Sequence, residues 1–151
     1  MSAWMTMADA VKTRLESLAA LAGVDVVVDR QKSISSMVAA AVGKAKGACV
    51  TILFDGAELT DDSGLATRPR FIIRLYAKPV IRDNDPEAVP ADDILEAMLP
   101  ALHHWSPKTR PSCYDLMEIS NPPAMLPDSK WLIYQFELTG RATLPAPEFL
   151  T

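Results

Sequence analysis

Three segments of the chain repeat apolar residues at the spacing of an amphipathic helix. The first is predicted over residues 6–22 and is followed by Gly23, which suits a helix C-terminus. The second follows Ser33, a suitable N-cap, and is expected to end at Gly47. The third is predicted over residues 92–105, with Asp92 or Asp93 as its N-cap. In chain order, the apolar stripes are Val11, Leu15, Leu18 and Ala22, then Ile34, Met37, Val38, Ala41, Val42 and Ala45, then Ile94, Leu95, Met98, Leu99, Leu102 and Trp105.

Pro100 lies inside the third predicted helix. A proline lacks the N–H that would bond the carbonyl of Glu96, and this loss inside a helix costs about 3 kcal/mol. We therefore expect the helix to be kinked or divided at this position.

Runs of β-branched or alternating apolar residues predict five strands. They cover residues 24–29, 48–54, 70–78, 113–119 and 130–141. Asp55-Gly56 is expected to turn the chain out of the second strand, and residues 58–69 to join it to the third as an exposed loop. The prolines of residues 121–123 predict a stiff connection before the last strand.

The order of these elements predicts an α+β fold. The order is helix, strand, helix, two strands, helix and two strands, and it indicates a mostly antiparallel β-sheet packed against about three α-helices. Residues 1–151 are expected to form a single domain, and residues 144–151 a proline-punctuated C-terminal arm.

The composition is that of a globular domain, and the charge and hydropathy exclude two classes of partner. The chain has 151 residues, of which 49% are hydrophobic and 23% charged, as in a single domain with a substantial core. Its net charge of −4 removes the electrostatic basis of non-specific DNA binding, and we expect no sequence-specific nucleic-acid partner. No apolar run approaches the roughly 18 residues of a membrane-spanning helix. We expect a soluble, cytoplasmic protein with no membrane partner.

The residues that carry chemistry form no recognisable catalytic or metal-binding motif. His103 and His104 are adjacent in a predicted helix, so their side chains are expected about 100° apart and unsuited to one metal ion. Cys49 and Cys113 are too few for a disulfide framework, and Cys49 is expected to be a buried, reduced thiol. The glycine- and lysine-containing segment 43–47 follows a helix, whereas a phosphate site precedes one. We expect no catalytic residue, cofactor or metal, and no enzymatic activity.

The layout resembles a family of phage assembly proteins. An N-terminal helix, a meander over residues 48–81, a helix in 92–105 and the long final strand around residues 131–138 are similar to the tail terminator or tail-completion proteins of long-tailed phages and prophages. Related folds occur in other head-to-tail joining and minor tail proteins. The resemblance implies a structural protein that forms a ring, commonly of six subunits, capping the tail tube and facing the head connector. Such a protein is cytoplasmic during assembly and then part of the virion tail.

A ring needs two different complementary surfaces on each subunit. One candidate is the mixed face of strand 70–78 with its arginines, and the other is formed by the acidic loops on the opposing side. Phe149 and Leu150 on the C-terminal arm are a third candidate contact. The charged candidates for the subunit interface are Arg68, Arg70, Arg74, Asp61, Asp62, Asp83 and Asp85.

Two other classes of function remain open. The chain is alternatively a small-molecule or peptide-binding α+β domain without catalysis, in which the sheet and the third helix enclose a pocket near Trp105 and Tyr114. The third possibility is an enzyme that uses His103 or His104.

Overall fold

Along the part of the chain that the structure describes, helices are interspersed with one strand, then two, then three consecutive strands. The structure is a computed structural model, and it describes residues 3–30, 34–44, 47–59, 66–78, 90–108, 116–128 and 130–143. The helices are α1 (Ala3–Glu16), the 3-10 turn η1 (Ala19–Leu21), α2 (Ile34–Val42) and α3 (Ala91–Leu102). The strands are β1 (Asp25–Asp29), β2 (Ala48–Leu59), β3 (Ala66–Ala77), β4 (Glu118–Leu126), β5 (Leu132–Thr139) and β6 (Ala142–Thr143).

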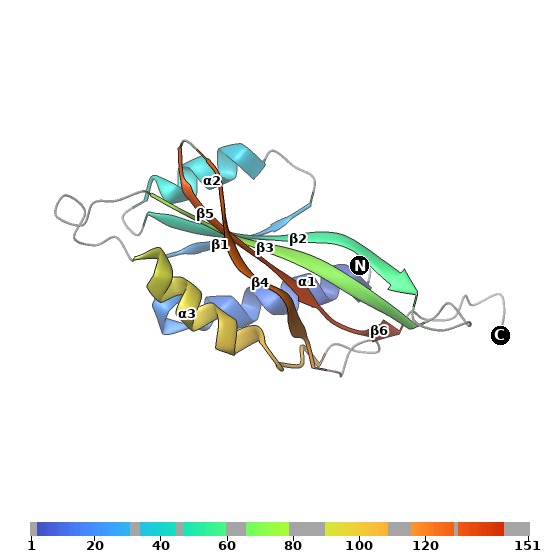
Figure 1. The fold of residues 1–151 in the computed structure, drawn as a ribbon. Helices are drawn as coiled ribbons and strands as arrows, with labels where there is room; N and C mark the ends of the chain where they lie inside the picture. The colour runs from blue at the N-terminus through green and yellow to red at the C-terminus, as the bar shows by residue number, and fades with distance from the viewer. Residues whose placement is uncertain are drawn as a thin grey trace.

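The strands form one sheet in the order β1-β2-β3-β5-β4, and β6 pairs with the beginning of β3 (Figure 1). Every neighbouring pair is antiparallel except β1 and β2, which are parallel. The predicted α+β class, with a mostly antiparallel sheet and three α-helices, is confirmed. The short parallel pair arises because α2 carries the chain from β1 back to the start of β2.

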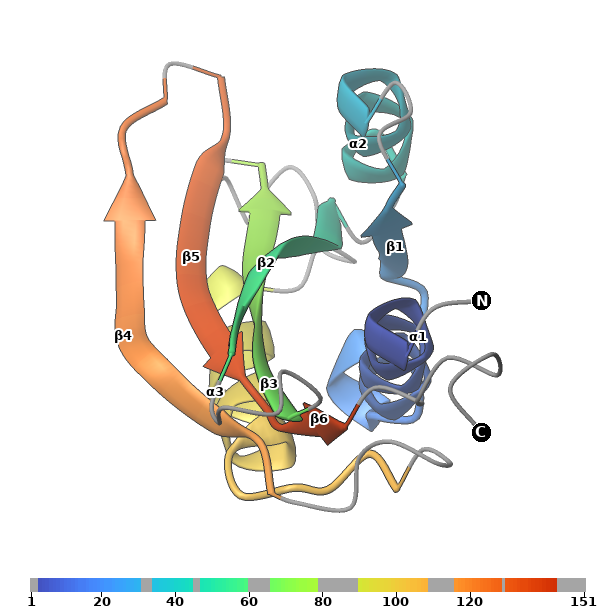
Figure 2. The same cartoon turned by 90° about the vertical axis from the view of Figure 1, so that its right-hand side faces the viewer.

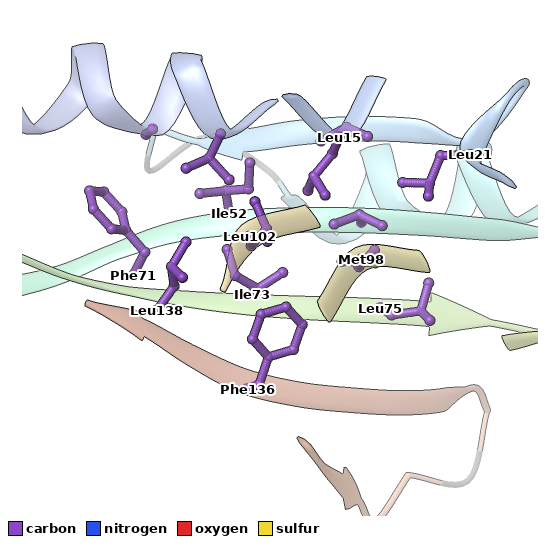
Figure 3. Packing of buried hydrophobic residues seen from close by; sticks show 14 of the residues in the cluster. Leu15, Leu21, Ile52, Phe71, Ile73, Leu75, Met98, Leu102, Phe136 and Leu138 are labelled. Atoms are coloured by element: carbon purple, nitrogen blue, oxygen red, sulfur yellow. The ribbon is translucent and has the colours of Figure 1, made fainter. Parts of the chain in front are cut away.

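The main core lies between the sheet and the helices α1 and α3, which cover the same face (Figure 1). The side chains of β3 alternate, so that Phe71, Ile73 and Leu75 point into this core, as the sequence pattern predicts. Figure 3 shows these three side chains along β3, in the same cluster as Leu15 of α1 and Met98 of α3. The largest fully buried side chains of the described residues are Met7, Leu15, Leu21, Ile52, Phe71, Ile73, Leu75, Ile94, Met98, Leu102, Met117 and Phe136.

A second, smaller core lies on the opposite face of the sheet, under α2. Val38, Ala41 and Val42 of the helix pack against side chains of β2, β3 and β5. The strand residues in this cluster are Cys49, Tyr76 and Ile133. Since α2 is only 9 residues long, it covers one end of this face and leaves the other end open.

The ends of α1 and α2 differ from the prediction. α1 begins at Ala3 and stops at Glu16, and η1 replaces the predicted last turn. The tighter turn buries Leu21 and leaves Ala22 exposed, although the helical spacing predicts that Ala22 is buried. α2 stops at Val42, well before Gly47, because the chain must turn there to enter β2.

The ends of α3 also differ. Its N-cap is Pro90, without a side-chain hydrogen bond, and the predicted caps Asp92 and Asp93 lie in the first turn. Pro100 does not divide the helix, which continues to Leu102. The proline lies in the last turn of α3, two residues before the helix ends at Leu102.

Two strands extend through residues that were expected to form turns or connections. β2 continues past Asp55 through a bulge at Gly56, whose φ of +117° suits glycine. β4 includes Pro122 and Pro123, and its pairing with β5 shifts register around them. Prolines fit there because β4 is an edge strand and its outer side needs no N–H donors. Within the predicted strand 113–119, β4 begins only at Glu118, and residues 113–115 lie outside the described residues.

Candidate functional site

The open end of the sheet face beside α2 carries a set of paired polar side chains. We call it the polar sheet face. It consists of Asp55 on β2, Arg70 and Arg74 on β3, Gln135 and Glu137 on β5, and Asn121 on β4. The alternation of β3 places its arginines on the face opposite the main core, as the sequence predicts.

Each arginine at the centre of this face already has a partner on a neighbouring strand. Nη2 of Arg70 lies 2.8 Å from Oδ2 of Asp55. Nε of Arg74 donates a hydrogen bond to Oε1 of Gln135 at 2.8 Å. These pairs tie β2, β3 and β5 together, and because they are exposed or half-buried they contribute little to the free energy of unfolding.

Arg68 lies nearer the tip of the β2–β3 hairpin. It is exposed and opposite Glu58 in the register of β2 and β3. Together with Asp55, Arg70 and Glu137 it lines an open hollow of about 420 Å³ with charges of both signs. The three predicted arginines therefore lie on one side of one strand.

The other predicted contact residues fall outside the described residues. These are the acidic residues of the two expected loops and the apolar pair of the C-terminal arm, namely Asp61, Asp62, Asp83, Asp85, Phe149 and Leu150. The proposed charge complementarity between arginines and acidic loops stays a prediction.

The two histidines lie beyond the end of α3, and this corrects their predicted place within the helix. His103 is the C-cap in an extended conformation, and His104 has a φ of +61°. Their rings stack with centroids 3.9 Å apart, whereas helical geometry predicts that they diverge. Nδ1 of His103 accepts a hydrogen bond from the Ile119 N–H at 3.1 Å, so the helix end is joined to β4.

The pocket expected near Trp105 and Tyr114 stays a prediction. Trp105 packs against the main core, and the guanidinium of Arg14 lies 5.6 Å from its ring centroid. Tyr114 lies outside the described residues.

An apolar hollow of about 450 Å³ opens beside the end of α3, and we call it the α3–β4 hollow. Leu99 and Pro100 form its helical wall, and His103 lies at the helix end. Ile119, Ser120 and Pro123 of β4 complete it. Sequence reasoning missed this site, although a proline pair next to a strand signal is typical of an edge strand.

A second groove, of about 490 Å³, lies at the opposite edge of the sheet, and we call it the β1 groove. Its floor is formed by residues 26–28 of β1. α1 contributes Asp9 and Lys12, and α2 contributes Met37. The carboxylate of Asp9 accepts two hydrogen bonds from Nη2 of Arg30, at 2.8 and 3.0 Å.

Met37 departs from the predicted apolar stripe of α2. Its side chain is 44% exposed, whereas the neighbouring Val38 is buried. The spacing predicts both as buried, but among the α2 side chains that the structure describes it is Val38, Ala41 and Val42 that pack on the sheet. An apolar side chain is therefore left at the surface beside β1.

The described residues contain no group of three or more histidine, cysteine, aspartate or glutamate side chains that would hold a metal ion. Cys49 is buried and free, and burial raises the pKa of its thiol to about 12. Within the described part of the chain, no helix is both long and apolar enough to cross a membrane. Comparison of the chain with protein-family models and with curated proteins gives no match.

Proposed function

We propose that this chain is a structural subunit of a phage or prophage tail, which assembles as a homo-oligomeric ring that caps the tail tube and joins it to the head connector. The proposal starts from the resemblance of element order described above. Its support in the fold is one observation: the sheet ends at two different strands, β1 and β4, on opposite sides of the molecule (Figure 2).

A head-to-tail ring requires two different surfaces on each subunit, and the two edges of the sheet differ from each other. In such a ring, one surface of each subunit contacts a different surface of the next subunit, and the chain of contacts closes on itself. Helices α1 and α3 pack on one face of the sheet and α2 packs on the other, so among the described elements no helix caps either lateral edge. Along the described residues, β1 pairs only with β2, and β4 pairs only with β5.

Native mass spectrometry and negative-stain electron microscopy test this proposal. We expect a ring, with six subunits as the expected number, and binding of the ring to one end of purified tail tubes. A protein that stays monomeric at high concentration, forms no ring and does not bind tail tubes would contradict it.

Binding of a small apolar molecule or a peptide is a second candidate function. The observation that favours it is the α3–β4 hollow, which is lined mainly by apolar side chains. Titration of the protein with a panel of apolar fragments, followed by NMR, separates the two functions. Saturable shifts confined to the hollow, from a protein that remains monomeric, would favour the binding domain.

A further inference from the structure

The α3–β4 hollow forms where the end of α3 meets the first half of β4 (Figure 1). We propose that it binds a neutral small molecule with an apolar body and one carbonyl oxygen, and that Nε2–H of His103 donates a hydrogen bond to that oxygen. The inference rests on the second candidate function, ligand binding at this hollow, and names the chemistry of the ligand.

The walls of the hollow suit an apolar body. Leu99 and Pro100 on α3, and Ile119 and Pro123 on β4, present aliphatic carbon to a ligand. The two prolines have rigid rings and no N–H, so the backbone adds no hydrogen-bond donor at these positions. The volume of about 450 Å³ lies in the range of small-molecule sites. A single hydrocarbon ring with a short substituent therefore fits this hollow.

The charges around the hollow favour a neutral ligand. Of the described residues that line it, none is an aspartate, glutamate, lysine or arginine. An ion bound there would give up part of its hydration without gaining an opposite charge, and that loss is costly. A neutral ligand carries no such cost.

His103 supplies the hydrogen-bond donor. Its Nδ1 accepts the bond from the Ile119 N–H, so in the neutral ring the proton is on Nε2. Within the described part of the chain, no residue accepts a hydrogen bond from this Nε2–H. The hydroxyl of Ser120, the other polar side chain in the lining, already lies 3.5 Å from the carbonyl oxygen of Glu137. The polar group that complements Nε2–H is an oxygen that accepts a hydrogen bond.

The ring of His103 is held in place before a ligand binds. Its Nδ1 lies 3.1 Å from the Ile119 nitrogen, and the ring of His104 stacks on it with centroids 3.9 Å apart. His104 is itself anchored, because its backbone N–H donates to the carbonyl oxygen of Met117 at 2.7 Å. A donor whose orientation is already fixed loses less conformational entropy on binding.

Two probes of the same shape test the proposed hydrogen bond. Acetophenone carries a carbonyl oxygen, and α-methylstyrene has a CH₂ group in its place. In NMR titrations we expect both probes to give saturable shifts at the residues that line the hollow. In nitrogen-15 spectra, Nε2 of His103 should respond to acetophenone and not to α-methylstyrene. An equal response to both probes would contradict the bond.

The variant His103→Asn separates the donor from the walls. The side-chain oxygen of asparagine can replace Nδ1 in the bond to Ile119, but this shorter side chain places no donor where Nε2 lies. We expect the Kd of acetophenone to rise about fivefold relative to that of α-methylstyrene, which is the contribution of one neutral hydrogen bond. Ser120→Ala is the matched control at the hollow and Met37→Ala the remote control, and both should leave this ratio unchanged. Far-ultraviolet circular dichroism checks that each variant is folded.

The outcomes distinguish the inference from the function on which it rests. If both probes bind and His103→Asn weakens them by the same factor, or not at all, the inference is wrong and apolar ligand binding stands. If Ser120→Ala weakens acetophenone and His103→Asn does not, the hydroxyl is the donor and the inference is again wrong. If neither probe gives saturable shifts at the hollow, the second candidate function fails together with the inference.

Discussion

The imidazole of His103 accepts a hydrogen bond from the backbone of β4, and this fixes its tautomer. Nδ1 lies 3.1 Å from the Ile119 nitrogen, so this ring atom carries no proton and Nε2 carries it in the neutral form. We predict that nitrogen-15 NMR of the neutral side chain reports the Nε2–H tautomer.

Substitution of His103 measures what this bond contributes. His103→Ala leaves the Ile119 N–H without its partner, and we expect a loss of about 1 kcal/mol in the free energy of unfolding. His103→Asn offers a side-chain oxygen near the position of Nδ1 and should recover part of that loss. Equal stability of the Ala and Asn variants in urea denaturation would show that the bond contributes nothing.

The thiol of Cys49 makes stability depend on alkaline pH. Burial raises its pKa from 9.0 to about 12 in the folded protein, so the unfolded chain loses the thiol proton first as the pH rises. The unfolded state is then favoured, and this group lowers stability by about 1.4 kcal/mol per pH unit above pH 9.

Urea denaturation between pH 8 and pH 10.5 checks this prediction. Other groups also titrate in that range, so the comparison is with Cys49→Ala, whose stability should fall less steeply. In a Cys113→Ser background, we also expect Cys49 to react with a thiol reagent only after unfolding. Fast reaction of the folded protein would contradict its burial.

At the scale of elements, the bulge in β2 depends on the backbone conformation of Gly56. A Cβ at this position would meet no atom within 4 Å, so the φ of +117° is the obstacle to any other residue. We predict that Gly56→Ala lowers the free energy of unfolding by about 1–3 kcal/mol through backbone strain alone. The neighbouring exposed substitution Ala57→Ser is the control. An unchanged urea midpoint for Gly56→Ala would show that the bulge rearranges without strain.

The elements that could be predicted are those whose pattern reports local burial. β3 places Phe71, Ile73 and Leu75 on the core side and its arginines on the other side. Since successive side chains of a strand point to opposite faces, only one face of this strand can be the buried one. The ends of elements could not be predicted in the same way. α1 stops at Glu16 because a tighter turn buries Leu21, and that gain depends on a core formed by distant strands.

At the scale of the whole molecule, the two cores share the same strands. Trp105 packs against the main core and Trp131 against the core under α2, and β2, β3 and β5 contribute to both clusters. We therefore predict that the two cores unfold together in a single transition.

Two variants with one tryptophan each test this cooperativity by fluorescence. Trp4→Phe with Trp131→Phe leaves Trp105 as the reporter, and Trp4→Phe with Trp105→Phe leaves Trp131. Each urea midpoint should coincide with the midpoint of the same variant by circular dichroism. A Trp131 transition at clearly lower urea would mean that α2 and its core unfold separately.

The candidate functional sites also divide into features of local pattern and features of tertiary packing. The placement of Arg68, Arg70 and Arg74 on one side of a strand follows from strand periodicity and could be predicted. The α3–β4 hollow and the exposure of Met37 could not, because each depends on how a helix packs against strands far away in the chain. The proline pair of β4 indicates an edge strand, but it does not predict which helix lies beside that strand.

The amino-acid sequence by itself determined the class of the fold and the buried faces of its main elements, since the periodicity of apolar residues is a local property. Only the tertiary structure decided the strand order, the parallel pairing of β1 with β2, and the two edges at which the sheet ends. Strand neighbours are chosen by contacts between residues that are distant in sequence, and no local pattern records them. The proposed head-to-tail ring depends on those edges.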